Sequence, residues 1–414
     1  MNNTKKLAVF IAITTFIISA TLFSIAIKIT IENTRTPIPI EHHTQDEIIQ
    51  KAKKLNIDFS LPDAHEKDYD IENRVMGKVS AKTEQASLNL LNFYRYVAGL
   101  PDDVELREDY VVSAQAGALV NAANDKMTHH PDEPENINHE LYEVGKKACS
   151  ESNLAWNHGS LLYSMVNGWM DDSNKSNIEV MGHRRWVLSP YMKYTGFGSV
   201  GAYTTMYALD NNRKTTISDE YIAWPAANTP VEMFKGSVFT VTLGENFDEP
   251  QLDNVEITLT SKSQDKTWTI NKDNKDVSFY ISNDNYCMPK CIIFKVTDFN
   301  NEDDIHIEIT GITKNKKETP IEYDVHLFSV SKLQTNHPTI KIQQNHIADV
   351  DIIASSLFSS KEPPIKWESA DSEISDIYYC PDIDELKFYG VEKGHTTIKA
   401  SIPGAEQIFD ITVY

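Results

Sequence analysis

The sequence predicts an α+β fold in which a mixed helical and β block is followed by two all-β sandwich domains and preceded by a transmembrane helix. Three observations indicate this. Residues 7–27 are apolar and uncharged, apolar residues recur at helical spacing between 83 and 170, and short alternating runs fill the chain after Pro230. At 414 residues the chain exceeds one ordinary core, so two to four domains are expected.

Residues 1–30 are expected to form a signal-anchor segment. The run 7–27 follows Lys5 and Lys6, and about 20 apolar residues span a bilayer core of ~30 Å. This run exceeds the apolar part of an ordinary cleaved signal peptide, so an uncleaved anchor is favoured, with cleavage and secretion as the alternative. The two lysines place the N-terminus in the cytoplasm and the remainder at the extracellular face of the membrane.

The next segments are a linker and three helices. Residues 31–80 mix prolines, acids and lysines without sustained periodicity and predict a stalk, in which short helices remain possible. A first helix is expected from Thr83 to the stop at Gly99, and a second with Asp109 as its N-cap. A third is expected to begin near Ser160.

Strand patterns dominate the rest of the chain. Two glycine-punctuated runs at 195–202 and 204–210 complete a first domain over 81–228. Alternating runs then predict one β-sandwich at 229–331 and another at 336–414, each folding independently of the first domain.

Charge and cysteine content exclude some classes of protein. A net charge of −21 disfavours a nucleic-acid surface. Four cysteines are too few for a disulfide-framed fold of this length. Cys287 and Cys291 form a C-x3-C pair that is compatible with a disulfide or with two free thiols, and ligands for a zinc site beside them are lacking.

Short motifs in a fixed order then point to a family. They are LNFYRYVAGL at 91–100, SAQAGAL at 113–119, MTHHP at 127–131, SESNLAW at 150–156, GWMDD at 168–172, and GHRRWVLSP at 182–190 with TGFGS at 195–199. This series resembles the CAP superfamily of cysteine-rich secretory, antigen 5 and pathogenesis-related proteins, in a bacterial branch. The resemblance implies an α-β-α sandwich.

The two β segments carry weaker resemblances. KWESAD at 366–371 and YGVEKGHTTIKASIPG at 389–404 resemble a bacterial immunoglobulin-like domain. Residues 229–331 are similar to a β module that often follows such CAP domains.

The CAP resemblance implies a cleft with two histidines and acidic residues. By motif position the histidines are His129 and His183, with His130 one residue from the first. Two neutral imidazoles facing each other across a cleft are able to bind zinc or another divalent metal. For His183, the competing interpretation is a hydrogen bond to the cleft loop without any metal.

The acidic candidates for catalysis are Asp172 and Glu151. Ser152 stands where many relatives have the acid, and Glu151 is one residue early, which on a strand places it on the opposite face. Asp172 follows Trp169 by three residues and shares its helix face, so it is expected toward a site of which Trp169 forms a wall, or else on the surface.

Two other chemistries remain open. Ser152 with a histidine base would make a weak hydrolase or peptidase, although the G-x-S-x-G elbow is lacking. Cys149 is a thiol nucleophile or, more commonly for Ala-Cys-Ser, a buried small residue. Arg184, Arg185 and Trp186 would contact an anionic ligand or, as favoured here, pack within the fold.

The sequence therefore favours an extracytoplasmic CAP-domain protein that binds a ligand, with or without a metal, at a two-histidine cleft. Candidate ligands are a cell-wall polymer, a lipid or a protein, the membrane is contacted through the N-terminal helix, and nucleic acid is not expected. The rival is a surface adhesion or scaffold protein with a vestigial cleft, which the serine at position 152 favours slightly.

Overall fold

The computed structural model describes residues 35–59, 62–234, 238–297, 299, 303–356, 365–380, 385–402 and 405–414. The apolar run at 7–27, expected to be an anchor, lies outside these residues. No helix in the described part of the chain is long and apolar enough to cross a membrane.

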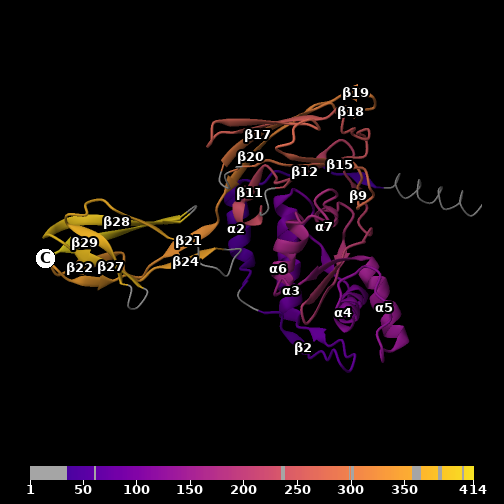
Figure 1. Cartoon of the computed structure of the whole chain (residues 1–414), viewed down its shortest axis with the longest axis horizontal. Helices are drawn as coiled ribbons and strands as arrows, with labels where there is room; N and C mark the ends of the chain where they lie inside the picture. Colours follow the sequence, from indigo (N-terminus) through magenta and orange to yellow (C-terminus); the bar gives the residue numbers. More distant parts are fainter. Residues whose placement is uncertain are drawn as a thin grey trace, which may run out of the picture.

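The first domain has three layers, with a small antiparallel sheet between two groups of helices (Figure 1). The sheet order is β5-β8-β7, with β5 at Ser152–Trp156, β7 at Phe197–Val200 and β8 at Tyr203–Tyr207. On one face α4 (Glu108–Ala123) packs on β7 and β8, and α5 (His139–Ser150) covers α4. The other side carries α3 (Ala81–Val97), α6 (Leu161–Tyr163), the π-helix η1 (Ser164–Met170) and α7 (Gly182–Val187). The α-β-α arrangement implied by the motifs is therefore present.

Several helix boundaries differ from the prediction. Helix α3 begins two residues before Thr83, because Ser80 caps it by accepting from the Thr83 N–H. Asp109 is not the N-cap of α4. That position is Arg107, whose side chain bonds Asp109 in the first turn. The third helix begins after Ser160 as expected but continues in π geometry, and α5 was not predicted.

Much of the segment predicted as a stalk packs on the first domain instead. Helix α2 (Gln45–Leu55) begins with a reciprocal Thr44–Glu47 capping box and lies against α3, with Ile48 fully buried. Strand β1 (Thr36–Pro37) pairs with β9 (Thr215–Thr216), and β2 (His65–Lys67) pairs with β3 (Lys78–Val79). The apolar positions of α2 explain the docking, because a helix buries its apolar face against another element.

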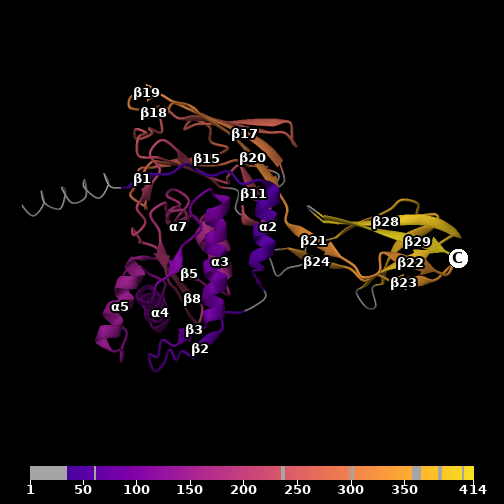
Figure 2. The same ribbon diagram turned by 180° about the vertical axis from the view of Figure 1, so that it is seen from behind.

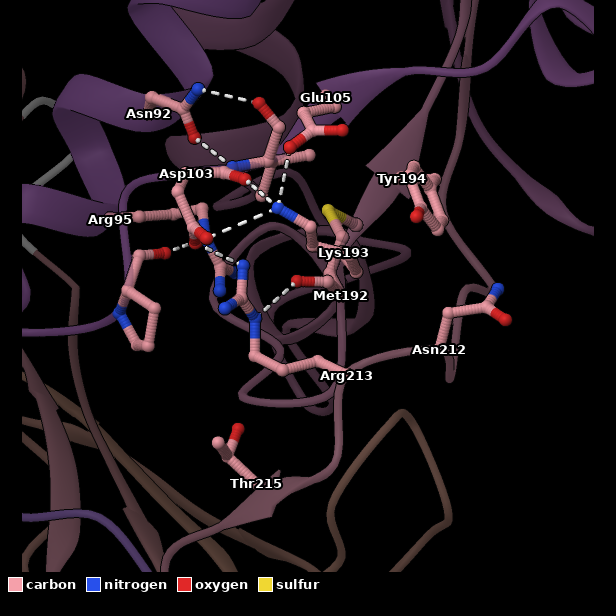
Figure 3. A network of polar contacts seen from close by, with 12 residues as sticks. Asn92, Arg95, Asp103, Glu105, Met192, Lys193, Tyr194, Asn212, Arg213 and Thr215 are labelled. Atoms are coloured by element: carbon pink, nitrogen blue, oxygen red, sulfur yellow. Dashed lines mark hydrogen bonds and ion pairs between the residues drawn. The ribbon is translucent and has the colours of Figure 1, made fainter.

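A polar network fastens one connection of the first domain (Figure 3). Lys193 Nζ donates to Glu105 at 2.7 Å and to Asp103 at 3.1 Å, and Arg213 also bonds Asp103. Arg95 of α3 donates to the carbonyl of Pro101. The network holds the segment after α3 beside a parallel pair, β4 (Glu105–Leu106) with β6 (Tyr194–Thr195).

The second β unit begins earlier than predicted. Strand β10 (Tyr221–Trp224) pairs with β12 (Phe239–Leu243), and β11 (Asn228–Pro230) pairs with β20 (Ile321–Phe328). The expected boundary at 228 thus cuts through this unit. Its two sheets are β10-β12-β16-β15 and β11-β20-β17-β13-β14. Their other strands are β13 (Glu256–Ser261), β14 (Lys266–Ile270), β15 (Ser278–Ser282), β16 (Cys291–Lys295) and β17 (Asp303–Thr310).

Two small elements complete the second unit and one hydrophobic core runs through both units. The elements are the 3-10 helix η2 (Val231–Met233) and the hairpin of β18 (Thr313–Lys314) and β19 (Lys317–Glu318). Leu91 and Trp169 of the first domain and Phe239 and Ile307 of the second unit belong to a single buried cluster. The two units therefore share their interior rather than folding around separate cores.

The C-terminal unit stands at the far end of the long axis (Figures 1 and 2). Strands β21 (Ser331–Gln334) and β24 (Ile353–Ser356) pair beside it. One sheet contains β22 (Thr339–Ile342), β25 (Lys366–Ser369), β28 (Gly394–Ile402) and β29 (Ala405–Val413), and the other contains β23 (Ile347–Asp349), β26 (Ser375–Cys380) and β27 (Glu385–Gly390). Its buried residues, including Phe388 and Phe409, form their own cluster.

Candidate functional site

A cavity of about 430 Å³ lies where the first domain meets the second β unit. The first domain contributes the end of α5, the start of β5 and the start of α7, and the second unit contributes a loop between β15 and β16. The lining residues are His129, His130, Ser150, Ser152, Asn153, Ser176, Asn177, Val180, Gly182, His183, Trp186, Leu209, Asn285 and Tyr286. A larger cavity of about 530 Å³ beside α2 and α3 has no histidine or cysteine in its wall.

His183 is the second residue of α7, and Asp172 holds its ring from behind. The imidazole Nδ1 lies 2.8 Å from Asp172 Oδ1, and the His183 backbone N–H donates to Oδ2 at 2.9 Å. The Asn177 amide also approaches Nδ1, at 3.3 Å, but the carboxylate is closer and, when ionised, only accepts, so it assigns the proton to Nδ1. The Nε2 atom is then the nitrogen with an available lone pair.

His129 is held in the same way by a different acceptor. Its Nδ1 lies 2.7 Å from the carbonyl oxygen of Cys149, which only accepts, so Nδ1 carries the proton and Nε2 is again available. Although His129 is exposed at the cavity mouth, the surrounding protein lowers its pKa, and the nearby His183 lowers it further. The two rings lie 6.3 Å apart, centroid to centroid, at an interplanar angle of 25°.

The donor set fits an open metal site rather than a structural one. Histidines that bind metals commonly donate their other nitrogen to a carboxylate or a backbone carbonyl, which is the arrangement of His183 and His129. In the described ranges no group of three or more His, Cys, Asp and Glu side chains could share an ion. A cation held here would therefore keep coordination positions for water or a ligand.

The two acidic candidates lie outside the cavity. Asp172, predicted as a catalytic acid, is fully buried beneath His183, and its carboxylate contacts that ring rather than lining the cavity. Trp169, the expected wall of the site, belongs to the hydrophobic core instead. Glu151 is the C-cap residue of α5 and accepts from the Tyr207 hydroxyl at 2.8 Å, away from the cavity lining.

The two nucleophile candidates have contrasting environments. Cys149 is completely buried against Gly117, and burial raises the pKa of its thiol to about 12, which disfavours the reactive thiolate. Ser152 lines the cavity, and its buried hydroxyl has no hydrogen-bond partner among the described residues. A Ser-His pair would need such a bond, so the geometry gives the hydrolase interpretation no support.

The basic residues after His183 connect the two units. Arg184 is fully buried and donates to the carbonyls of Met170 and Val238, and Arg185 donates to that of Asp284. This agrees with the predicted structural role, although the partners are carbonyls rather than Trp186. All four cysteines are free, including Cys287 and Cys291.

One comparison with known proteins bears on the first domain. Residues 88–214, from within α3 to the residue before β9, match the model of the CAP cysteine-rich secretory protein family. The chain contains a CAP domain. The match spans His129 and His183 and confirms the family resemblance for this region, and CAP-family proteins are typically extracellular or secreted. A search of the curated proteins finds no match.

Solved structures resemble parts of the chain only distantly. They include S-layer protein SbsC domains 4 and 5 (11% identity, 42% of this chain, 82% of that chain, TM-score 0.18). Dpr2 Ig1-Ig2 in complex with DIP-Theta Ig1-Ig3 matches at 9% identity over 45% and 93%, with TM-score 0.17. Amphioxus IgVJ-C2 matches at 12% over 43% and 97%, with TM-score 0.16. These TM-scores are too low to assign a fold.

The second unit contributes residues that the sequence did not predict. Asn285 and Tyr286 line the cavity about 100 positions after His183 in the chain. Their neighbours in sequence carry no motif, so only the folded arrangement brings them to the histidines.

Proposed function

We propose that this extracytoplasmic CAP-domain protein binds a ligand at the cavity that contains His129 and His183, with a divalent cation, zinc by ligand type, between the two imidazoles. One observation supports this above the others. The rings of His129 and His183 each have Nδ1 held by an acceptor fixed in the fold, which leaves both of their Nε2 atoms available in one cavity.

The residues around the cation define what the site would do. A bound zinc ion would polarise an oxygen of the ligand as a Lewis acid. His129 and His183 would hold it, and Asp172 would keep the His183 ring oriented. With two protein ligands, binding is weak and reversible, and folding does not depend on the metal.

A second candidate function is surface adhesion or scaffolding through the β units. It is favoured by the lining of the cavity, which contains no carboxylate to act as a general acid or base. Both candidates place the folded part outside the cell, with residues 7–27 as a membrane anchor.

Titration calorimetry with zinc on the full chain tests the metal site. At about pH 7.5, where free imidazole is neutral, we expect a saturable heat in the wild type. The His129→Ala, His183→Ala double variant should lose it. His139→Ala serves as the matched control, because this histidine bonds Glu133 on the surface of α5. Equal heats from the wild type and the double variant, or no heat from either, would favour the scaffold.

A further inference from the structure

The chemistry of the cavity wall points to a class of ligand. We propose that the cavity binds a neutral saccharide, gripped between the CAP domain and Tyr286 of the second β unit. This inference rests on the proposed function, because it names the ligand of the same cavity.

The wall of the cavity carries no fixed charge. None of its 14 residues is Lys, Arg, Asp or Glu, whereas 24% of the whole chain is charged, so about three would be expected by chance. In the metal-free cavity, an organic anion or cation would lose its hydration without meeting an oppositely charged side chain, which is costly. The wall therefore favours an uncharged ligand.

The same wall is rich in hydrogen-bonding groups of both kinds. It contains three serine hydroxyls and three asparagine amides, and its aliphatic side chains are only Val180 and Leu209. A lipid chain would leave these polar groups unpaired. Ligand hydroxyls, by contrast, both donate and accept and so match hydroxyl and amide partners.

Ser152 gives independent support for a polar ligand. This serine is only 4% exposed and lines the cavity. Its Oγ has no hydrogen-bond partner within the described ranges. A buried hydroxyl without a partner costs free energy, so such groups are normally satisfied. A ligand hydroxyl at this position would satisfy it.

Tyr286 supplies an apolar platform at the rim. Its ring packs on the backbone of Gly182, where a Cβ atom would stand only 2.7 Å from Cδ1. The ring is nevertheless 38% exposed, and Trp186 also lines the cavity. Aromatic rings offer apolar faces with polar tips, which suits a sugar ring that has an apolar C–H face and hydroxyls at its edge.

The loop that carries Tyr286 is fastened before any ligand arrives. Arg185 of α7 donates to Ser282 Oγ at 2.9 Å, to the Asp284 carbonyl at 2.6 Å and to the Met288 carbonyl. Its guanidinium also lies 5.4 Å from the centre of the Tyr286 ring. A platform held in place costs less ordering entropy on binding. The second unit thus completes the site and contributes to its specificity.

Binding of neutral oligosaccharides to the full chain tests the inference. Binding is measured by saturation-transfer NMR. The neutral probes are triacetylchitotriose, cellotriose and maltotriose. A heparin tetrasaccharide is the anionic comparator, and trialanine is the peptide comparator. We expect at least one neutral trisaccharide to bind. Tyr286→Ala and Ser152→Ala should weaken it at least about tenfold, the scale of losing one packed aromatic ring or one buried hydrogen bond.

The control variants distinguish the loss of the Tyr286 ring from a loss of folding. Tyr286→Phe should retain binding, because the ring and not the hydroxyl forms the platform, and Tyr378→Ala removes an exposed tyrosine of the C-terminal unit without effect. If trialanine or heparin binds and the neutral sugars do not, or if zinc binds and no sugar does, the saccharide inference is wrong and the metal proposal is unaffected. Sugar binding without any zinc heat supports it while the metal proposal fails.

Discussion

His183 and the Asp172 carboxylate are joined by two hydrogen bonds, one from the imidazole and one from the backbone. Nδ1 lies 2.8 Å from Oδ1, and the His183 backbone N–H donates to Oδ2, which the Arg184 N–H also reaches at 3.3 Å. The carboxylate is completely buried, so water does not compete for these bonds. Asp172 thereby fixes both the start of α7 and the orientation of the ring that faces the cavity.

Asp172→Asn should therefore weaken zinc binding about 10- to 100-fold, the usual effect of losing a carboxylate behind a metal-binding histidine. The amide presents a neutral group in the same shape, so His183 loses the charged acceptor that selects its tautomer. Titration calorimetry measures the affinity. Glu151→Gln is the matched control, because its carboxylate bonds Tyr207 outside the cavity. Equal affinities in the wild type and Asp172→Asn would contradict this role.

Acid should destabilise the metal-free protein through His129. Its pKa in the fold is lowered because the surrounding protein partly desolvates this exposed ring, and further by His183, so the unfolded chain takes up the proton first. The contribution of neutral His129 to the free energy of unfolding is fully present above about pH 6.5. It is lost as the pH falls through the lower pKa of the folded state. The urea midpoint of the wild type should fall more steeply between about pH 7 and pH 5 than that of His129→Gln. Parallel plots of urea midpoint against pH for the two proteins would contradict this role of His129.

The family resemblance implied the layers of the first domain, and apolar spacing predicted strands in both β units, because it distinguishes helices from strands. The predicted helix boundaries were wrong where a local side-chain contact sets the start of the helix. Asp109 was expected as a cap, yet its carboxylate bonds the Arg107 side chain. Helix α5 was missed although Asn138 caps it, and Tyr142, Gly145 and Ala148 recur at helical spacing on its buried side.

The candidate site was predictable only in part. The motif order brought out the two histidines that the structure places in one cavity. The burial of Asp172 followed from the left-handed backbone at that residue and the turn into α7, which spacing from Trp169 does not encode. Tyr286 lay beyond prediction, since its contact with Gly182 joins segments far apart in the chain.

Residues 7–27 should remain attached in the mature protein. The apolar run is long enough to span a bilayer, and the sequence Ser24–Ala26 is a poor cleavage site. Full-length protein should fractionate with membranes and resist extraction by high salt. N-terminal sequencing of the mature protein checks this, and a start near residue 27 would show cleavage and secretion instead.

The first domain and second β unit should unfold as one body, and the C-terminal unit separately. Arg184 of α7 is buried, and its guanidinium bonds the Val238 carbonyl and Thr240 Oγ1 of the second unit. Strand β10 also needs β12 as its partner. A fragment covering residues 81–228 would expose these groups and half of the shared core, so we expect no cooperative transition from it.

Two further measurements check this division. A fragment of residues 35–334 should unfold cooperatively, and a fragment of residues 336–414 should show its own transition, because its buried cluster is separate. Arg184→Met in the full chain should lower the stability of the first transition by at least about 3 kcal/mol, since it leaves buried carbonyls without donors, and should leave the second unchanged. Arg107→Met, which removes a partly exposed guanidinium on the first domain, is the control. Equal losses in both transitions would mean that the three units share one cooperative fold.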